Sequence, residues 1–189
     1  MREAASYSIF ETAIGRCAIV WRGGSILATA LPAESDQATL AHLRRRFPDL
    51  TVAEPVAQIA DAIVAIQQLL AGEPADLTRI EVDLANCPPF ERQVYEILRA
   101  VPPGSTITYG ELAAQAGAPG AARAVGVAMG RNPVPIIVPC HRVLAGSGRS
   151  GGFSAPGGVT TKFRILQIEQ AGRAGPPLLF DDLPLAVRS

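Results

Sequence analysis

The hydrophobic period of this chain changes near Asn86-Cys87-Pro88-Pro89, and this change constrains the fold more than any other feature. Before it, short β-branched or aromatic runs are separated by Gly-containing connections, a pattern typical of strands in a sheet. After it, apolar residues recur at helical spacing. We therefore predict an α+β protein with a small α/β domain over residues 1–86 that contains an antiparallel sheet. A mostly helical domain follows over 87–172, and a C-terminal tail over 173–189.

The first domain is expected to hold an antiparallel meander and two helices. Ser35 or Asp36 is the predicted N-cap of the first helix, and Gly72 follows the end of the second. The predicted strands are 7–12, 17–21, 25–31 and 80–84, and the predicted helices are 36–47 and 55–70.

The second domain is expected to be built from helices. One runs from Phe90 to Val101 and stops at Pro102. Thr108 is the predicted N-cap of a short helix through residue 116, and Pro119 lies near the start of another through residue 129. Two short helices joined by a Gly-containing turn resemble a helix-turn-helix. A last helix is predicted over 160–170.

Charge is distributed unevenly, although the formal net charge is zero. Residues 1–87 carry 7 Lys+Arg against 11 Asp+Glu, whereas residues 88–172 carry 8 against 4. The second half is therefore cationic, as a surface that meets phosphates should be.

Composition restricts the class of protein further. No apolar run is long enough to span a bilayer, and the first residues do not form a signal peptide, so we expect a cytoplasmic protein without a membrane partner. The three cysteines, Cys17, Cys87 and Cys140, are odd in number and far apart, which argues against a disulfide framework. Cys17 and His42 are the obvious metal-ligand candidates in the first domain. Two ligands do not make a structural zinc site, so we predict no metal and no cofactor.

The strongest chemical motif is Pro139-Cys140-His141-Arg142-Val143. It places a thiol beside an imidazole that can take its proton, and the thiolate is the reactive form of cysteine. Taken alone, a Cys-His pair is more often a buried structural cysteine beside a surface histidine. A second unusual segment, residues 120–130, consists almost entirely of small residues around Arg123. Such a helix can pack tightly in a core or approach a DNA groove closely.

Together these motifs resemble the methylated-DNA–protein-cysteine methyltransferases, the O6-alkylguanine-DNA alkyltransferases. The matching segments are Tyr109 to Ala113, Ala121 to Gly126, Asn132 to Val143, Gly157-Gly158, and then Lys162 and Glu169. The resemblance implies a ribonuclease H-like first domain. It also implies a monomer that acts on double-stranded DNA containing O6-alkylguanine, with O4-alkylthymine left open as a second substrate, and that associates with the nucleoid when on DNA.

The resemblance also implies roles for individual matched residues. Cys140 would accept the alkyl group irreversibly, His141 would act as its base through a water, and Glu169 would orient His141. Asn132 would brace the active-site turn. The residues implied to contact DNA are Tyr109, Arg123, Ala121 and Ala122, with Arg123 filling the space left by a flipped base.

The pocket for the base would be lined by Met129, Val143, Phe153 and Ser154. Many relatives carry Tyr where this chain has Phe153, and Ala155-Pro156 form an apparent insertion, which puts the range of accepted alkyl groups in doubt.

Three other function classes remain for comparison. A protein that binds alkylated bases and flags them without efficient transfer would not need Cys140. A methylation-sensing regulator would need a cysteine-rich zinc domain. A cysteine hydrolase would need an oxyanion hole and would have no use for Arg123 on a small-residue helix.

Overall fold

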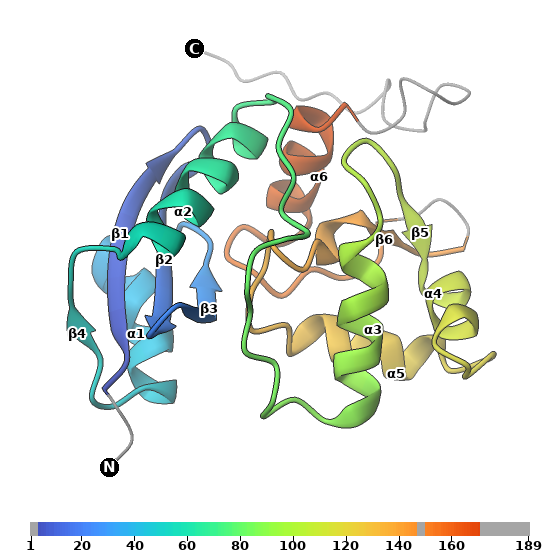
Figure 1. The fold of residues 1–189 in the computed structure, drawn as a ribbon. Coiled ribbons are helices and arrows are strands. Elements are labelled where there is room, and N and C mark those ends of the chain that lie inside the picture. Colours follow the sequence, from blue (N-terminus) through green and yellow to red (C-terminus); the bar gives the residue numbers. More distant parts are fainter. Residues whose placement is uncertain (1–3, 147–149, 171–189) are drawn as a thin grey trace.

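The computed structural model describes residues 4–146 and 150–170, so the predicted tail over 173–189 lies outside the described residues. Its first half is a four-stranded sheet in the order β3-β2-β1-β4, with a helix on each face (Figure 1). Its second half is a group of helices around a two-stranded parallel pair. The predicted α+β class is confirmed.

The elements of the first half run close to their predicted positions. The strands are β1 (Ser6–Thr12), β2 (Gly15–Arg22), β3 (Ser25–Ala30) and β4 (Thr51–Val52), and the helices are α1 (Asp36–Arg46) and α2 (Ala57–Leu70). The Ser35 side chain accepts a hydrogen bond from the Ala38 N–H, so it is the N-cap of α1. β1, β2 and β3 form the predicted antiparallel meander.

The sheet departs from the prediction at two points. β4 adds to β1 in parallel, so the sheet is mixed rather than wholly antiparallel. Residues 80–84 do not form a strand, because only Val82 pairs, as an isolated bridge to Ile26 on β3. The Asp83 side chain accepts from the Ala85 N–H and turns the chain away after this single contact.

The central strand β2 explains how the two halves share a core. Its side chains alternate between the two faces of the sheet, as the period of a strand requires. Ala18 and Val20 pack on the α1 side, whereas Cys17, Ile19 and Trp21 join a cluster with α2. That cluster continues without a break into the buried side chains of the second half. The two halves are therefore packed against each other.

The second half contains α3 (Pro89–Arg99), β5 (Ile107–Thr108), α4 (Tyr109–Gln115), α5 (Ala122–Gly130), the 3-10 helix η1 (Cys140–Arg142), β6 (Val143–Leu144) and α6 (Gly158–Ile168). Thr108 and Glu111 form a capping box at the start of α4, which confirms Thr108 as its N-cap. The prediction that the next helix begins near Pro119 is wrong by a few residues. Gly120 has a φ of 88°, which a right-handed helix cannot accept, so α5 begins after it.

Candidate active site

Cys140 lies at the start of η1, at the end of a tightly held turn. We call residues 132–142 the acceptor segment. Ile136 within it has a φ of 76°, a conformation that β-branched residues rarely adopt. The Asn132 side chain holds the turn from inside, since its amide donates to the Val138 carbonyl at 2.8 Å and its oxygen accepts from the Val134 N–H at 3.0 Å. Asn132 therefore braces the turn, in the position that the sequence suggested.

His141 is fully buried and is joined to Glu169 just beyond the end of α6. Its Nε2 lies 2.9 Å from Oε1 of Glu169. Burial alone would raise the pKa of Glu169, but hydrogen bonds from His141 and Arg142, together with the positive charge of Arg142, outweigh burial and lower the pKa to about 2. An ionised carboxylate can only accept hydrogen bonds, so Nε2 of His141 carries the proton. Nδ1 has no hydrogen-bond partner among the described residues and keeps its lone pair.

Arg142 completes this buried group. Its Nε donates to Oε2 of Glu169 at 2.9 Å, and a terminal nitrogen donates to Oε1 at 2.7 Å. A third donor reaches the carbonyl of Val101 at 2.5 Å. The bidentate pair fixes the carboxylate plane, and thereby the orientation of His141. Arg142 belongs to the motif at residues 139–143, but its pairing with Glu169, 27 residues further along the chain, leaves no local signal in the sequence.

The surroundings of Cys140 favour a neutral thiol that can still lose its proton to a base. Burial raises the pKa of the Cys140 thiol. Four features act in the opposite direction and favour the thiolate: the Asn132 side chain, the charge of Lys162, and the backbone N–H groups of Cys140 and His141. Burial lowers the pKa of His141, although Glu169 partly offsets this effect. A neutral imidazole beside a protonated thiol is the resting state expected of a nucleophile with its general base.

Lys162 is a buried residue near Cys140 for which the sequence indicated no role. It is completely buried, and its ammonium donates to the carbonyls of Val143 and Ser150. Burial lowers the pKa of Lys162 to about 8, while the nearby Cys140 thiolate would raise it. Lys162 thus connects β6 to the following loop and places a positive charge near Cys140. A charged residue on a helix gives no local signal that it is buried.

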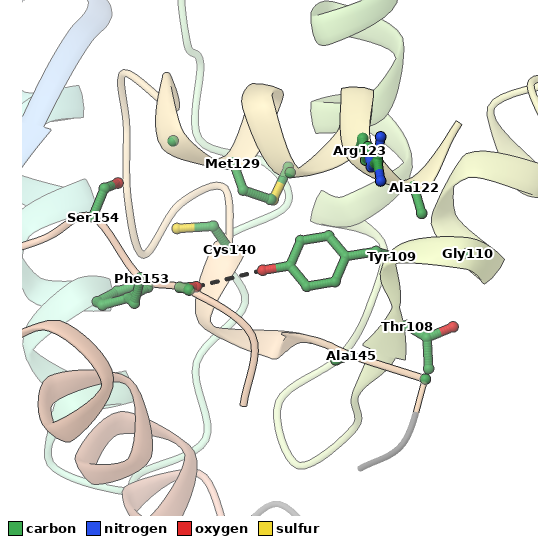
Figure 2. A pocket seen from close by; sticks show the side chains of 14 residues that line it. Thr108, Tyr109, Gly110, Ala122, Arg123, Met129, Cys140, Ala145, Phe153 and Ser154 are labelled. Atoms are coloured by element: carbon green, nitrogen blue, oxygen red, sulfur yellow. Dashed lines mark hydrogen bonds between the residues drawn. The ribbon is translucent and has the colours of Figure 1, made fainter. Parts of the chain in front are cut away.

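A cavity of about 780 Å³ opens beside Cys140. Figure 2 shows Tyr109, Met129, Phe153 and Ser154 around it, together with Arg123 and Ala122 at the α5 side. The sequence named all six of these residues as site residues. Two others that were predicted for the DNA surface or the base pocket are not brought to the cavity wall. Ala121 precedes α5, and Val143 lies in β6 with its side chain fully buried.

One wall of the cavity is the pocket loop, which we define as residues 150–156. The Tyr109 hydroxyl donates to the Gly152 carbonyl at 3.4 Å. A Cβ at Gly151 would lie only 2.7 Å from the Tyr109 ring, and Gly151 also has a φ of 63°. A larger residue is excluded there on both grounds. The loop therefore lies directly against Tyr109.

The opposite rim is formed by α5. Arg123 lies in the first turn of this helix, its side chain is exposed, and it has no ion-pair partner among the described residues. The neighbouring Ala122 and Gly126 also border the cavity, and a Cβ at Gly126 would meet nothing within 4 Å. The small residues thus leave the helix surface open around a single cation.

The described residues contain no group of three or more His, Cys, Asp and Glu side chains that could hold a metal ion. Within the same part of the chain, no helix has the length and apolar character needed to cross a membrane.

Comparison with known proteins agrees with this geometry. Residues 89–171 match the family model described as 6-O-methylguanine DNA methyltransferase, DNA binding domain. The chain is 44% identical to the methylated-DNA–protein-cysteine methyltransferase of Mycobacterium bovis over 118 residues, which are 62% of this chain and 70% of the relative. Its counterpart from Mycobacterium leprae is 43% identical over 122 residues, covering 65% and 72%.

Solved structures extend the likeness over the first half. The crystal structure of Mycobacterium tuberculosis OGT in complex with DNA has a TM-score of 0.72 and 32% identity, and the match covers 92% of this chain and 97% of that one. The O6-methylguanine-DNA methyltransferase of Pyrococcus kodakaraensis has a TM-score of 0.66 and 29% identity, covering 87% and 98%. With the Cys-His motif in the predicted setting, these matches show that the chain belongs to the methylated-DNA–protein-cysteine methyltransferase family.

Proposed function

We propose that this protein repairs double-stranded DNA by moving the alkyl group of O6-alkylguanine to Cys140 in one irreversible step. The observation that carries the proposal is the buried His141–Glu169 pair beside Cys140, at a cavity bordered by the exposed Arg123. The relatives are named as methyltransferases that act between methylated DNA and a protein cysteine, and one structural neighbour was solved in complex with DNA.

The chemistry follows from the residues around the thiol. Nδ1 of His141, acting through a water, takes the proton of Cys140, and Glu169 stabilises the imidazolium that forms. The thiolate attacks the alkyl carbon, so that an S–C bond forms while the C–O6 bond breaks. The electron pair of that bond leaves with guanine, which takes up a proton at N1. This proton balances the one that His141 removed from Cys140, and the imidazole becomes neutral again. A thioether is a poor leaving group, so each molecule acts once and is consumed.

The base must leave the stack before Cys140 can reach it. Base flipping costs a few kcal/mol, and a damaged pair lowers that cost. We assign α4 and α5 as a helix-turn-helix whose second helix lies against the minor groove, with Ala121 and Ala122 allowing close approach. Arg123 fills the space left by the base, and Tyr109 contacts the base and crowds the adjacent phosphate. The exposed, unpaired Arg123 at the cavity rim supports this assignment.

Within the pocket, Met129, Phe153 and Ser154 surround the flipped guanine, and a backbone N–H near Ser154 donates to O6. The carbonyls of Cys140 and Val143 accept from its amino group. Val143 contributes through its backbone, which is consistent with its buried side chain. Its carbonyl has two lone pairs and can keep its bond to Lys162 as well.

The same proposal covers the organisation of the chain. Residues 87–172 form the DNA-binding and acceptor domain, and residues 1–86 form a ribonuclease H-like domain packed against it. The protein acts as a monomer in the cytoplasm and associates with the nucleoid when bound to DNA. No cofactor takes part in the step written above.

Intact mass spectrometry tests the proposal. The protein is incubated with a duplex that contains one O6-methylguanine. A stoichiometric gain of one methylene mapping to Cys140, without further turnover, is the expected result. Cys140→Ala should abolish the gain while DNA binding largely persists, and Cys87→Ala, which alters a half-buried thiol elsewhere, should not affect it. An unchanged mass with tight lesion binding would instead favour a recognition protein that flags lesions.

A further inference from the structure

The acceptor segment carries two prolines shortly before Cys140, Pro133 and Pro135. Proline has no backbone N–H, so this stretch donates fewer hydrogen bonds than an ordinary loop, although each of its carbonyls still requires a donor. Asn132 meets part of this requirement from within the segment, through the Val138 carbonyl. The carbonyls of Pro133 and Pro135 instead accept from a residue of the first half.

That residue is Thr29 on β3. Its N–H donates to the Pro133 carbonyl at 3.0 Å, and its hydroxyl donates to the Pro135 carbonyl at 2.7 Å. β3 is an edge strand of the sheet, and it faces the second half in Figure 1. The outer backbone groups of an edge strand can bond to another segment. One residue of the first half therefore holds the acceptor segment at two points.

The bond from the Thr29 hydroxyl meets the segment next to its most constrained residue. The Pro135 carbonyl belongs to the peptide unit that precedes Ile136, whose φ is 76°. A conformation of this kind persists only where the surrounding structure holds it. Thr29 fixes the chain before Ile136, and Asn132 fixes it after Ile136, at the Val138 carbonyl. The turn is therefore held on both sides of Ile136.

The position of Cys140 depends on the same turn. The Cys140 N–H donates at 2.8 Å to the Val138 carbonyl, which also accepts from the Asn132 amide. The Asn132 side chain is in addition one of the groups that favour the Cys140 thiolate. A shift of the turn would therefore displace the thiol and its supporting amide together.

We infer that Thr29 is a positioning residue for alkyl transfer, which holds the acceptor segment from the first half so that Sγ of Cys140 meets the alkyl carbon in line. This inference rests on the proposed function and gives the first half a part in the reaction. Thr29 acts through Pro135 and Ile136 rather than on the reacting atoms. Misplacement of a reacting group by about 1 Å can cost about 100-fold in rate, so a looser turn should be visible in the transfer rate.

Substitutions at residue 29 separate this role from support of the fold alone. Thr29→Val and Thr29→Ala remove the hydroxyl but keep the backbone N–H, whereas Thr29→Ser keeps both. Ser25→Ala is the matched control, since Ser25 lies on the same strand and its hydroxyl donates to the exposed Glu81 at 2.6 Å. Three quantities are measured for each protein: the affinity for an unmodified duplex, the single-turnover rate at saturating O6-methylguanine duplex, and the free energy of unfolding in urea.

Thr29→Val and Thr29→Ala should lower the transfer rate by about tenfold at a temperature where they are fully folded. Their affinity for duplex should stay within about twofold of the unaltered value, because α4 and α5 are unchanged. Thr29→Ser should restore the rate to within about twofold, and Ser25→Ala should leave it there.

An unchanged transfer rate in Thr29→Val and Thr29→Ala would overturn the inference even if their stability fell, because Thr29 would then support only the fold. An equal loss of rate in Thr29→Ser or Ser25→Ala would also overturn it, since the Thr29 hydroxyl would not be responsible. Either result leaves the proposed function intact. Absence of methyl transfer by the unaltered protein would refute the proposed function, and this inference with it.

Discussion

Replacing Arg142 by Met tests whether the buried group around Glu169 holds the site together. The side chain of Arg142 is 6% exposed, and that of Glu169 is completely buried. Substitution removes both hydrogen bonds to the carboxylate and the one to the carbonyl of Val101. Glu169 would then remain buried with His141 alone.

The magnitude follows from the loss of one partner of a buried ion pair, which costs about 3–5 kcal/mol. For a chain of this size we expect the melting temperature to fall by about 6–20 °C. The pKa of Glu169 should rise, since burial would no longer be outweighed, and His141 would lose its fixed orientation. Methyl transfer should therefore slow at temperatures where the variant is still folded. Arg142→Lys should be intermediate, because it keeps the charge but loses the planar fork.

The assay is urea denaturation at neutral pH, combined with single-turnover methyl transfer. Arg16→Met is the control, because Arg16 also bridges carboxylates, those of Glu11 and Asp36, but its side chain is 51% exposed. An exposed pair contributes about 1 kcal/mol or less. If Arg142→Met lowered the free energy of unfolding no more than Arg16→Met does, the buried pair of Arg142 and Glu169 would not hold the site together.

Three further predictions concern other buried groups and one concerns the DNA contact. Because the pKa of Glu169 is about 2 against an ordinary 4.5, its carboxylate stabilises the fold above pH 4.5. That contribution, about 3 kcal/mol, is lost as pH falls toward 2. The free energy of unfolding, measured by urea denaturation, should therefore change less between pH 7 and pH 3 in Glu169→Gln than in the unaltered protein. The pKa of Lys162 is about 8 in the folded protein, against an ordinary 10.5. The contribution of Lys162 to the free energy of unfolding should therefore become more favourable as pH rises from 8 to 10.5. The difference in stability between wild type and Lys162→Met should shift in favour of wild type over this range, and a pH-independent difference would contradict the assigned pKa. Tyr95→Phe removes the hydroxyl that donates to the Ala128 carbonyl at 2.7 Å and should cost about 1 kcal/mol in urea denaturation. Arg123→Ala should slow repair of duplex by about tenfold or more beyond its effect on free O6-benzylguanine, since only duplex requires flipping; equal effects would argue against that role.

Much of the fold was predictable because it depends on local periodicity. Strands β1, β2 and β3 and helix α2 follow from apolar runs and their spacing, and the Thr108 cap follows from its position before a helical pattern. The two-residue strands β4, β5 and β6 were not predicted, since two residues carry no period. Residues 80–84 alternate like a strand but pair at one residue, because pairing depends on what lies beside the segment.

The candidate site divides in the same way. The sequence alone determined the acceptor motif and the nearby braces of its turn, because Cys140, His141 and Asn132 lie within nine residues of one another. The tertiary structure decided which distant groups are buried with them. Glu169 and Lys162 come from α6 and its end, and the half-buried Thr29, at the edge of the sheet, donates to the carbonyl of Pro135 in the acceptor segment. Desolvation and hydrogen bonds between distant residues arise from packing, so the charge states of the site could be determined only once the chain was folded.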